Sequence, residues 1–478
     1  MPFLDSFPGA SEKAFSDVAA LIVLAPAGSP CPVGRDETLI SVLGQSRPPS
    51  LVVVVDTSPL PGQRSLSVDD VSPEFADEAG GPTPQVLRVR APGAKRFSSA
   101  VSDALQAVPE ALQHQWLWLL HDDVVAEPDA LDLLLERGNQ SRNIGAVGPK
   151  QVRYEDSSQL LEVGIDATAS ARRVFLVEPD EIDQGQHDQR EDVLAVGTAG
   201  ILVRSSAWED VEGLDPALGP FGDGLEFGRR LWRGGHRVVV QPSAVIRHAQ
   251  TSYRHETDGS ASFSARRAAQ LYNWALPLPR WRLVLFAVWA PILTLLRAVS
   301  RLFSRHPGLA FAEITAYFRF LRMAPALRKA RARLKRVARV PRGSLAPLEA
   351  DAAQIAQARR ARRRIVSHGS ESPIPIDEGA AAELRTHRLR AIGGFVALVA
   401  GATLVALFAW FPYRSGLQGG SWGALPRDWT TLLAQAWSGW QVFGDGAPGP
   451  ASPLLAPLSI LAAPFALVRL SPLDLGNL

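Results

Sequence analysis

A series of short apolar runs, separated by longer polar stretches, constrains the fold of the first half of this 478-residue chain. Most runs are rich in β-branched residues and nearly free of charge, which is typical of strands buried on both faces by crossover helices. Between residues 19 and 248 they read AALIVLAPA, LVVVVDTS, QVLRVR, WLWLLHDD, IGAVGPK, VLAVGTAGILVR and HRVVVQPSAVIRH. The sequence therefore predicts an α/β domain with a mainly parallel central sheet.

Carboxylates follow two of these runs, where a ligand is expected. Ligands of open α/β sheets bind beyond the carboxyl ends of the strands. LVVVVD ends at Asp56, and WLWLLHDD ends at Asp122 and Asp123. A carboxylate pair at such a position suits Mg²⁺ or Mn²⁺ bridging to phosphate oxygens. The structural alternative is that these residues only end strands and begin turns, such as an Asx-turn at Asp56.

Two later segments supply further candidate groups. In GPFGDGLEFGRRLWRGG, Asp223 precedes a helical pattern, and Glu226 follows three residues later. Either carboxylate could be a general base on a glycine-flanked loop, although Asp223 could equally be a helix N-cap. Arg230 in the same segment could face phosphate or solvent. His248, at the end of VVVQPSAVIRH, gains significance only if the fold brings it to Asp123.

In order and spacing, these segments resemble the family 2 glycosyltransferases of GT-A fold, over residues 19–250. The resemblance assigns nucleotide-sugar binding to Asp56, Asp122, Gly197, Gly200 and Arg230, a divalent Mn²⁺ or Mg²⁺ to His121, Asp123 and His248, and the catalytic base to Asp223 or Glu226. Two positions depart from the family pattern. His121 stands at the first position of the Asp-x-Asp metal motif, and Gly224 replaces the second acidic residue of the catalytic pair.

The function implied by this resemblance is an inverting transfer of a sugar from a nucleotide-diphospho-sugar to a glycan or lipid-linked acceptor of the cell envelope. Large actinobacterial membrane-associated glycosyltransferases are the most similar group, given the Ala- and Arg-rich composition and the apolar tail. The two departures leave an alternative, in which a degenerate, non-catalytic GT-A domain acts as a membrane scaffold or a nucleotide-sugar-binding module.

The composition changes after residue 280. Residues 281–303 are long and apolar but contain Pro291, Arg297 and Arg301. These residues favour a helix that lies on or re-enters the membrane surface, with its charged ends snorkelling. We therefore expect a catalytic domain at 1–280 and amphipathic, interfacial helices at 281–345.

A basic segment follows, in which many Arg and Lys residues between 322 and 364 are opposed only by Glu349 and Asp351. Such a segment binds nucleic acid or the anionic face of a membrane. Its position between two apolar regions, without interleaved aromatic residues, favours the membrane and predicts no nucleic-acid partner. Residues 346–390 are accordingly expected to form a basic cytoplasmic linker.

The last region, 391–478, is expected to be transmembrane. Residues 392–412 form an uncharged stretch long enough to span a bilayer, and 452–470 form a weaker, proline-broken candidate. The positive-inside rule keeps residues 1 to about 390 on the cytoplasmic side of the cell membrane. The N-terminus lacks a basic region before an apolar run, which predicts no secretory signal, and the end of the chain is compatible with a piece of a longer polytopic protein.

Overall fold

The computed structural model describes residues 15–26, 31–34, 36–59, 66–71, 84–175, 177–178, 180–251 and 260–351, together with 440–441 and 447–448. The chain divides into two compact units, Met1–Ser370 and Glu371–Leu478. The second contributes only the short strands β13 (Trp440–Gln441) and β14 (Ala447–Pro448). The expected membrane spans at 392–412 and 452–470, and nearly all of the basic linker, lie outside the described residues.

The first unit begins with alternating strands and helices, as the apolar runs predict. Its strands are β1 (Ser16–Leu24), β2 (Pro49–Asp56), β3 (Ser67–Asp70), β4 (Gln85–Arg90), β5 (Trp116–His121), β6 (Val124–Ala126), β7 (Ile144–Arg153), β8 (Leu160–Glu162), β9 (Asp166–Ala167), β10 (Arg173–Val174), β11 (Ile201–Arg204) and β12 (Arg237–His248). Its helices are α1 (Glu37–Leu43), α2 (Phe97–Ala107), η2 (Pro109–Gln113), α3 (Ala130–Asn139), α4 (Ser205–Asp210), α5 (Asp223–Gly234), α7 (Ser260–Ala275), α8 (Arg280–Phe303), α9 (Pro307–Arg322), α10 (Ala324–Val337) and η3 (Arg342–Leu348).

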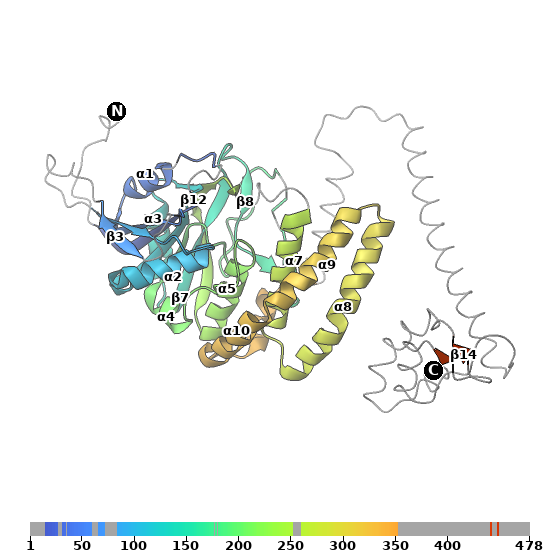
Figure 1. Ribbon diagram of the computed structural model, residues 1–478. Helices are drawn as coiled ribbons and strands as arrows, with labels where there is room; N and C mark the ends of the chain where they lie inside the picture. The colour runs from blue at the N-terminus through green and yellow to red at the C-terminus, as the bar shows by residue number, and fades with distance from the viewer. Residues whose placement is uncertain are drawn as a thin grey trace, which may run out of the picture. The chain divides into compact units, whose positions relative to one another are not determined.

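The central sheet has ten strands in the order β3-β4-β2-β1-β5-β11-β7-β12-β6, with β8 paired to β7 (Figure 1). Strands β4, β2, β1 and β5 run parallel to one another, and so do β7 and β12. Strand β11 is antiparallel to both of its neighbours, β5 and β7. The α/β class is therefore confirmed, and the sheet is mixed because β11 lies in reverse between its two parallel parts and because β3, β6 and β8 are also antiparallel to their neighbours.

Both faces of the sheet are buried, which accounts for the continuous apolar runs. Along neighbouring strands, Leu21 and Val53 enter one core cluster, whereas Ile22 and Val52 enter the other. Helices α2, α4 and α5 supply side chains to the first cluster, and α1 and α3 supply them to the second. The register pairs Val23 with His121 and Leu24 with Asp56, so β1, β2 and β5 end at one edge of the sheet.

Helix α5 lies directly on the loop before β11. A Cβ on Gly228 would lie 2.5 Å from Ala195 Cβ, 2.7 Å from Ala195 Cα and 2.8 Å from the Leu194 carbonyl oxygen. One turn earlier, a Cβ on Gly224 would lie 2.4 Å from the Val196 carbonyl oxygen. Two glycines spaced by four residues therefore form a flat helix face that permits contact between backbones.

Helices α7 to α10 form a separate layer with its own apolar cluster, which includes Tyr272, Phe286, Phe320 and Leu327. Helix α8 buries one stripe, formed by Phe286, Ala290, Thr294 and Ala298 at four-residue spacing. Most of its remaining large apolar side chains are exposed. Among the described residues, α8 is the one helix long and apolar enough to cross a membrane, with 22% of its most apolar window buried.

The glycine face of α5 can be tested with Gly228→Ala. We expect the free energy of unfolding to fall by about 1–2 kcal/mol, because overpacking against backbone atoms outweighs the gain in helix propensity. The matched control is Gly308→Ala in α9, where nothing lies within 4 Å of the new Cβ. Chemical denaturation should show the control unchanged or slightly more stable, and equal losses in both variants would contradict the close packing.

Candidate active site

A cavity of about 550 Å³ lies at the carboxyl edge of β5 and β12, between the start of α5 and the helices α7 and α8. Six of its lining residues form the chemical centre, and they are His121, Asp123, Gln151, Thr198, Asp223 and His248. They come from β5, the turn between β5 and β6, β7, the loop before β11, the first turn of α5 and the end of β12. The fold therefore gathers residues that are far apart in the sequence.

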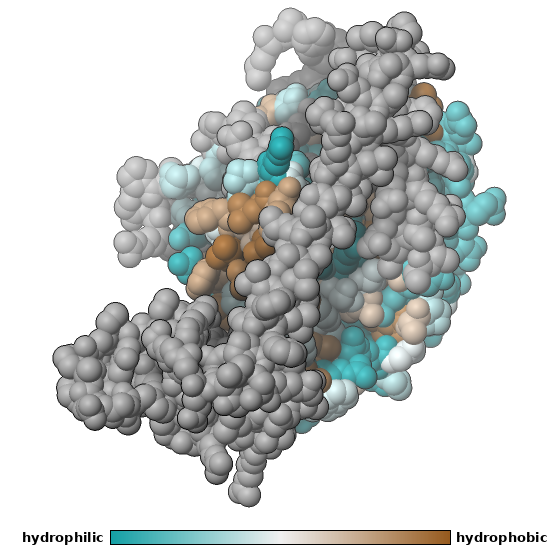
Figure 2. Space-filling view, turned by 90° about the vertical axis from the view of Figure 1, so that its right-hand side faces the viewer, coloured by the Kyte–Doolittle hydropathy of each residue, from teal (hydrophilic) through white to brown (hydrophobic). Residues whose placement is uncertain are grey.

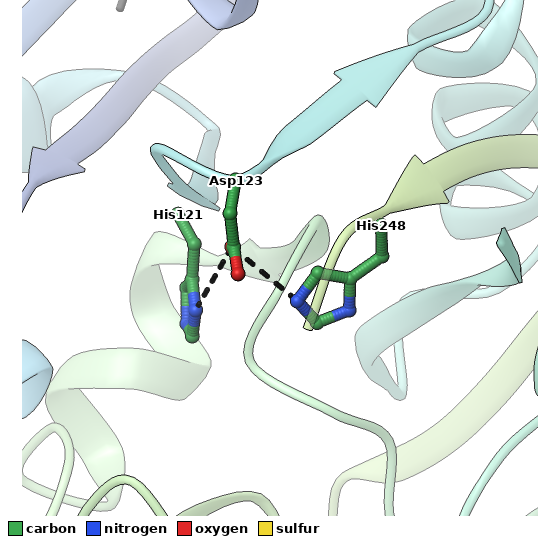
Figure 3. A group of neighbouring side chains, drawn as sticks. All are labelled: His121, Asp123 and His248. Carbon is green, nitrogen blue, oxygen red and sulfur yellow. Dashed lines mark ion pairs between the residues drawn. The ribbon is translucent and has the colours of Figure 1, made fainter. Parts of the chain in front are cut away.

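His121, Asp123 and His248 form a compact group (Figure 3). Asp123 Oδ1 lies 3.3 Å from His248 Nε2 and 3.9 Å from His121 Nδ1, and one ligand atom from each residue lies within 4.8 Å of the others. Strand pairing sets this geometry, because β12 pairs with β6 and places His248 opposite Val124, the residue after Asp123. Two imidazoles and a carboxylate at this separation can hold a divalent cation.

The hydrogen bonding of Asp123 fits a bound cation. Its Oδ2 accepts a hydrogen bond of 2.7 Å from the Thr251 amide, whereas Oδ1 is buried and has no hydrogen-bond partner. Burial acts to raise the pKa of Asp123, but His248, His121 and the Thr251 amide together hold it well below its usual range. A buried carboxylate oxygen of this kind is stabilised by a positive charge near it, which a bound cation or a protonated imidazole would supply.

A neighbouring glutamine orients His248. The Gln151 amide nitrogen donates to the Ala199 carbonyl at 2.9 Å, which directs its oxygen to His248 Nδ1, also at 2.9 Å. Nδ1 must therefore carry the hydrogen, and the Nε2 of a neutral ring then presents its lone pair toward Asp123. Metal-bound histidines are commonly held by such a bond from their other ring nitrogen.

His121 is packed against Phe97, with ring centroids 4.2 Å apart, and faces the cavity. Burial lowers the pKa of His121, and His248 adds to this effect, while Asp123 and Asp223 oppose it. A neutral ring is the form that ligates metals. Its Nε2 lies 3.1 Å from the Thr198 hydroxyl, which leaves Nδ1 directed to Asp123.

Asp223 reaches the same cavity from the first turn of α5, after Gly222 in the left-handed conformation (φ 79°). The Thr198 hydroxyl donates to Asp223 Oδ2 at 3.5 Å and also contacts His121, so it connects the carboxylate to the His–Asp–His group. Gly224 has no room for a side chain beneath α5, which gives a packing reason for its departure from the family's acidic pair.

The structure does not bring Glu226 and Arg230 to the cavity. They form a buried ion pair on α5, with Arg230 Nη2 2.7 Å from Glu226 Oε2, and both side chains are only 1% exposed. Arg230 also donates to the carbonyls of Val211 and Gly213. Their arrangement holds α5 against the turn after α4, so a role in base catalysis or phosphate binding has no geometric support.

The other predicted residues lie near the group without joining it. The Asp122 carboxylate accepts a hydrogen bond of 2.6 Å from the Ala25 amide. The Asp56 carboxylate accepts a hydrogen bond from the Ser58 amide, as the Asx-turn alternative expects, and forms an ion pair of 2.8 Å with Arg88. Burial acts to raise the pKa of Asp56, but its bonds with Ser58 and Arg88 lower it overall.

The two predicted glycines differ in position. Gly197 lines the cavity, and its amide donates to Glu162 at 2.9 Å. Gly200 has a φ of 88° and lies against Ile246, where a Cβ would come within 2.2 Å of the Ile246 side chain. The first therefore stays a candidate for ligand binding, and the second shapes the turn into β11.

Sequence reasoning missed Gln151, Thr198 and a group of arginines on α7 and α8 that face the same cavity. Gln151 lies in β7 without any flanking motif, and Thr198 is one small residue within VGTAG. Nothing in their local patterns distinguishes them, because their importance depends on contacts across the sheet.

The candidate cation site predicts a large effect of His248→Ala. Removing one of three ligands should weaken Mn²⁺ binding by the full chain at least about tenfold, since loss of even an orienting partner costs that much. Electron paramagnetic resonance of unbound Mn²⁺ measures the change. The exposed His306, at the start of α9, provides the control His306→Ala, and an equal effect of both substitutions would argue against the site.

Comparisons with known proteins agree with this fold. Residues 35–273 match the family described as glycosyltransferase-like family 2. The O-antigen biosynthesis protein RfbC of Myxococcus xanthus is 28% identical over 169 residues, which is 34% of this chain but only 13% of that protein. This chain therefore matches a small part of a much longer relative.

Two solved glycosyltransferases are also similar, at low scores. GalNAc-T7 with UDP, GalNAc and Mn²⁺ is 15% identical with a TM-score of 0.35, and covers 48% of this chain and 43% of that one. The mannosyltransferase PcManGT of Pyrobaculum calidifontis, in complex with GDP-Man and Mn²⁺, is 16% identical with a TM-score of 0.33, covering 66% and 91%. Because the family match over residues 35–273 covers half of the chain's length, the chain belongs to glycosyltransferase-like family 2.

Proposed function

We propose that the first unit transfers a sugar from a nucleotide-diphospho-sugar to an acceptor hydroxyl, with inversion at the anomeric carbon. One observation carries the proposal: Asp223 and the His121–Asp123–His248 group line one cavity and meet at the Thr198 hydroxyl. A candidate base thus lies beside a candidate cation site. Inversion is supported by the resemblance to family 2.

The three clustered residues hold the cation in this proposal. A divalent cation supplies neutralisation of the charge that develops on the departing diphosphate. Two imidazole ligands favour Mn²⁺ over Mg²⁺, because Mg²⁺ strongly prefers oxygen ligands. Gln151 keeps the His248 ring in the ligating orientation, and Thr198 does the same for His121.

Asp223 is the proposed base. Its carboxylate takes the proton of the acceptor hydroxyl as the hydroxyl oxygen bonds to the anomeric carbon. The bond from that carbon to the diphosphate breaks on the opposite face, and its electron pair leaves with the diphosphate. Asp56 and Asp122 stay candidates for nucleotide contacts, because they lie along the same sheet edge as His121.

The acceptor is proposed to be part of a lipid-linked or cell-envelope glycan, reached at the cytoplasmic face of the membrane. Exposed apolar residues gather on α8 and α9 and include Trp281, Trp289, Leu295, Leu296, Phe311 and Phe318, which are 55–71% exposed. Figure 2 shows hydrophobic residues gathered on the side of the molecule that carries these helices. The name of the M. xanthus relative, an O-antigen biosynthesis protein, also supports an envelope glycan.

The second candidate function is a non-catalytic domain that binds a nucleotide-sugar as a scaffold. Gly224 in place of an acidic residue is the observation that favours it. A scaffold of this kind would show no metal-dependent transfer or hydrolysis of any nucleotide-sugar.

The assignment of the base predicts opposite outcomes for two carboxylates. Asp223→Asn should lower kcat about 10²–10⁴-fold and leave donor affinity nearly unchanged, because only proton transfer is lost. Glu226→Gln should instead cost about 3–5 kcal/mol of stability, because Arg230 would be left buried without its partner. Steady-state kinetics and thermal unfolding separate the two, and full activity of Asp223→Asn would exclude it as the base.

The membrane-facing surface can be tested in the full chain. Cys31 is the sole cysteine, so Cys31→Ser permits one spin label at Leu296→Cys on α8 or at Ile40→Cys on α1. The two native side chains are 60% and 59% exposed. In proteoliposomes, we expect collisions with lipid-dissolved oxygen to dominate at position 296 and collisions with an aqueous nickel complex to dominate at position 40. Aqueous behaviour at both positions would contradict membrane contact by α8.

A further inference from the structure

A smaller cavity, of about 30 Å³, lies where α5 meets the end of α7, α10 and η3. Four arginines and two carboxylates line it, and they are Arg229, Arg230, Arg233, Arg342, Glu226 and Glu349. None of these six residues lines the active-site cavity. A cavity of this size holds a monatomic ion or about two water molecules, which excludes a sugar, a nucleotide or a lipid headgroup as its ligand.

The charges around this cavity do not balance. Both carboxylates are already paired, Glu226 with the arginine one turn later on its own helix and Glu349 with Arg229 at 3.0 Å. Within the described part of the chain, Arg233 and Arg342 form no ion pair with a carboxylate. The side chains that line the cavity therefore leave two positive charges without a neutralising partner.

Arg229 brings unused hydrogen-bond donors to this site. It is only 8% exposed, and its Nη2 donates to the Thr168 carbonyl at 2.7 Å and to Glu349. Its Nε and Nη1 are buried and have no hydrogen-bond partner among the described residues. Burial lowers the pKa of Arg229 to about 10, with Glu349 opposing and Arg342 adding to the effect, and burial and Arg342 also lower the pKa of Arg233. Buried donors without an acceptor are costly, so an acceptor in the cavity would stabilise this arrangement.

An anion suits this cavity better than water alone. Water can accept the N–H groups of Arg229, but it leaves the charges of Arg233 and Arg342 without neutralisation. A monovalent anion accepts the same hydrogen bonds and supplies the missing negative charge. The volume leaves room for one water molecule beside the anion, and that water can donate to Asn273, a lining residue whose Oδ1 is buried without a hydrogen-bond partner among the described residues.

We propose that this cavity binds a small monovalent anion of the halide class, such as chloride, between Arg229, Arg233 and Arg342. The anion holds α5 against η3, because Arg229 and Arg233 belong to α5 and Arg342 begins η3. It thereby stabilises the seat of the helix whose first turn carries Asp223. The inference goes beyond the proposed function and does not depend on it, since these three arginines have no role in the proposed transfer.

The test compares thermal unfolding of the full chain, in detergent micelles, in sodium chloride and in sodium gluconate at equal pH and ionic strength. Equal ionic strength keeps screening constant, and gluconate is too large for the cavity. The variant Arg342→Gln removes one of the two unneutralised charges without breaking an ion pair between described residues. Its control, Arg328→Gln, removes one exposed charge of α10 outside the cavity lining.

We expect chloride to raise the unfolding midpoint of wild type by about 2–4 °C over gluconate. In Arg342→Gln this shift should be at least about twofold smaller, because one of the charges that attract the anion is gone. In gluconate the same variant should be as stable as wild type or more stable, because a repulsion between like charges is removed. The control should keep the full shift. No shift in wild type, an undiminished shift in Arg342→Gln, or an equal loss in Arg328→Gln would overturn the anion site.

A second measurement detects binding without unfolding the protein. Broadening of the chloride nuclear magnetic resonance line reports exchange of chloride with sites on the full chain. Wild type and Arg328→Gln should broaden the line more than Arg342→Gln does. The double variant Arg229→Gln/Glu349→Gln, which removes the buried cation together with its partner, should also broaden it less. Equal broadening by all four proteins would mean that chloride meets only surface charges and that water alone fills the cavity.

Discussion

The pairing of β12 with β6 is the constraint on which the site depends. These strands are antiparallel, and their register places His248 beside the residue that follows Asp123. Strand β12 also runs parallel to β7 through nearly its whole length, which anchors it between β7 and the edge strand β6. Because a shift of one residue would turn His248 to the other face, the apolar pattern of β12 also determines whether the His–Asp–His group exists.

A second constraint is that two positions of α5 carry no side chain. Gly224 and Gly228 let α5 lie on the loop before β11, and this contact carries Asp223 to the cavity. The same turn of α5 carries Glu226, but the helix directs it away from the cavity to the buried pair with Arg230. Two carboxylates three residues apart thus have different environments, one facing a cavity and the other neutralising a core arginine.

Elements from both layers line the cavity. The sheet and α5 contribute Asp123, Asp223 and two imidazoles, and α7 and α8 contribute arginines. The layer of helices after the catalytic domain is therefore part of the site as well as a carrier of exposed apolar surface. Helix α8 contributes Arg301 to the cavity lining and also carries much of the exposed apolar surface, so the candidate site and the proposed membrane face share one helix.

The sequence by itself determined the α/β class, the order of the strands along the chain and the position of candidate carboxylates at strand ends. These features are local, since a buried strand must be apolar and a strand end is polar wherever it occurs. The partners of those carboxylates were decided only by the tertiary structure. Gln151 behind His248, Glu226 with Arg230, and the arginines of α7 and α8 depend on contacts between segments distant in the chain, which no local pattern encodes.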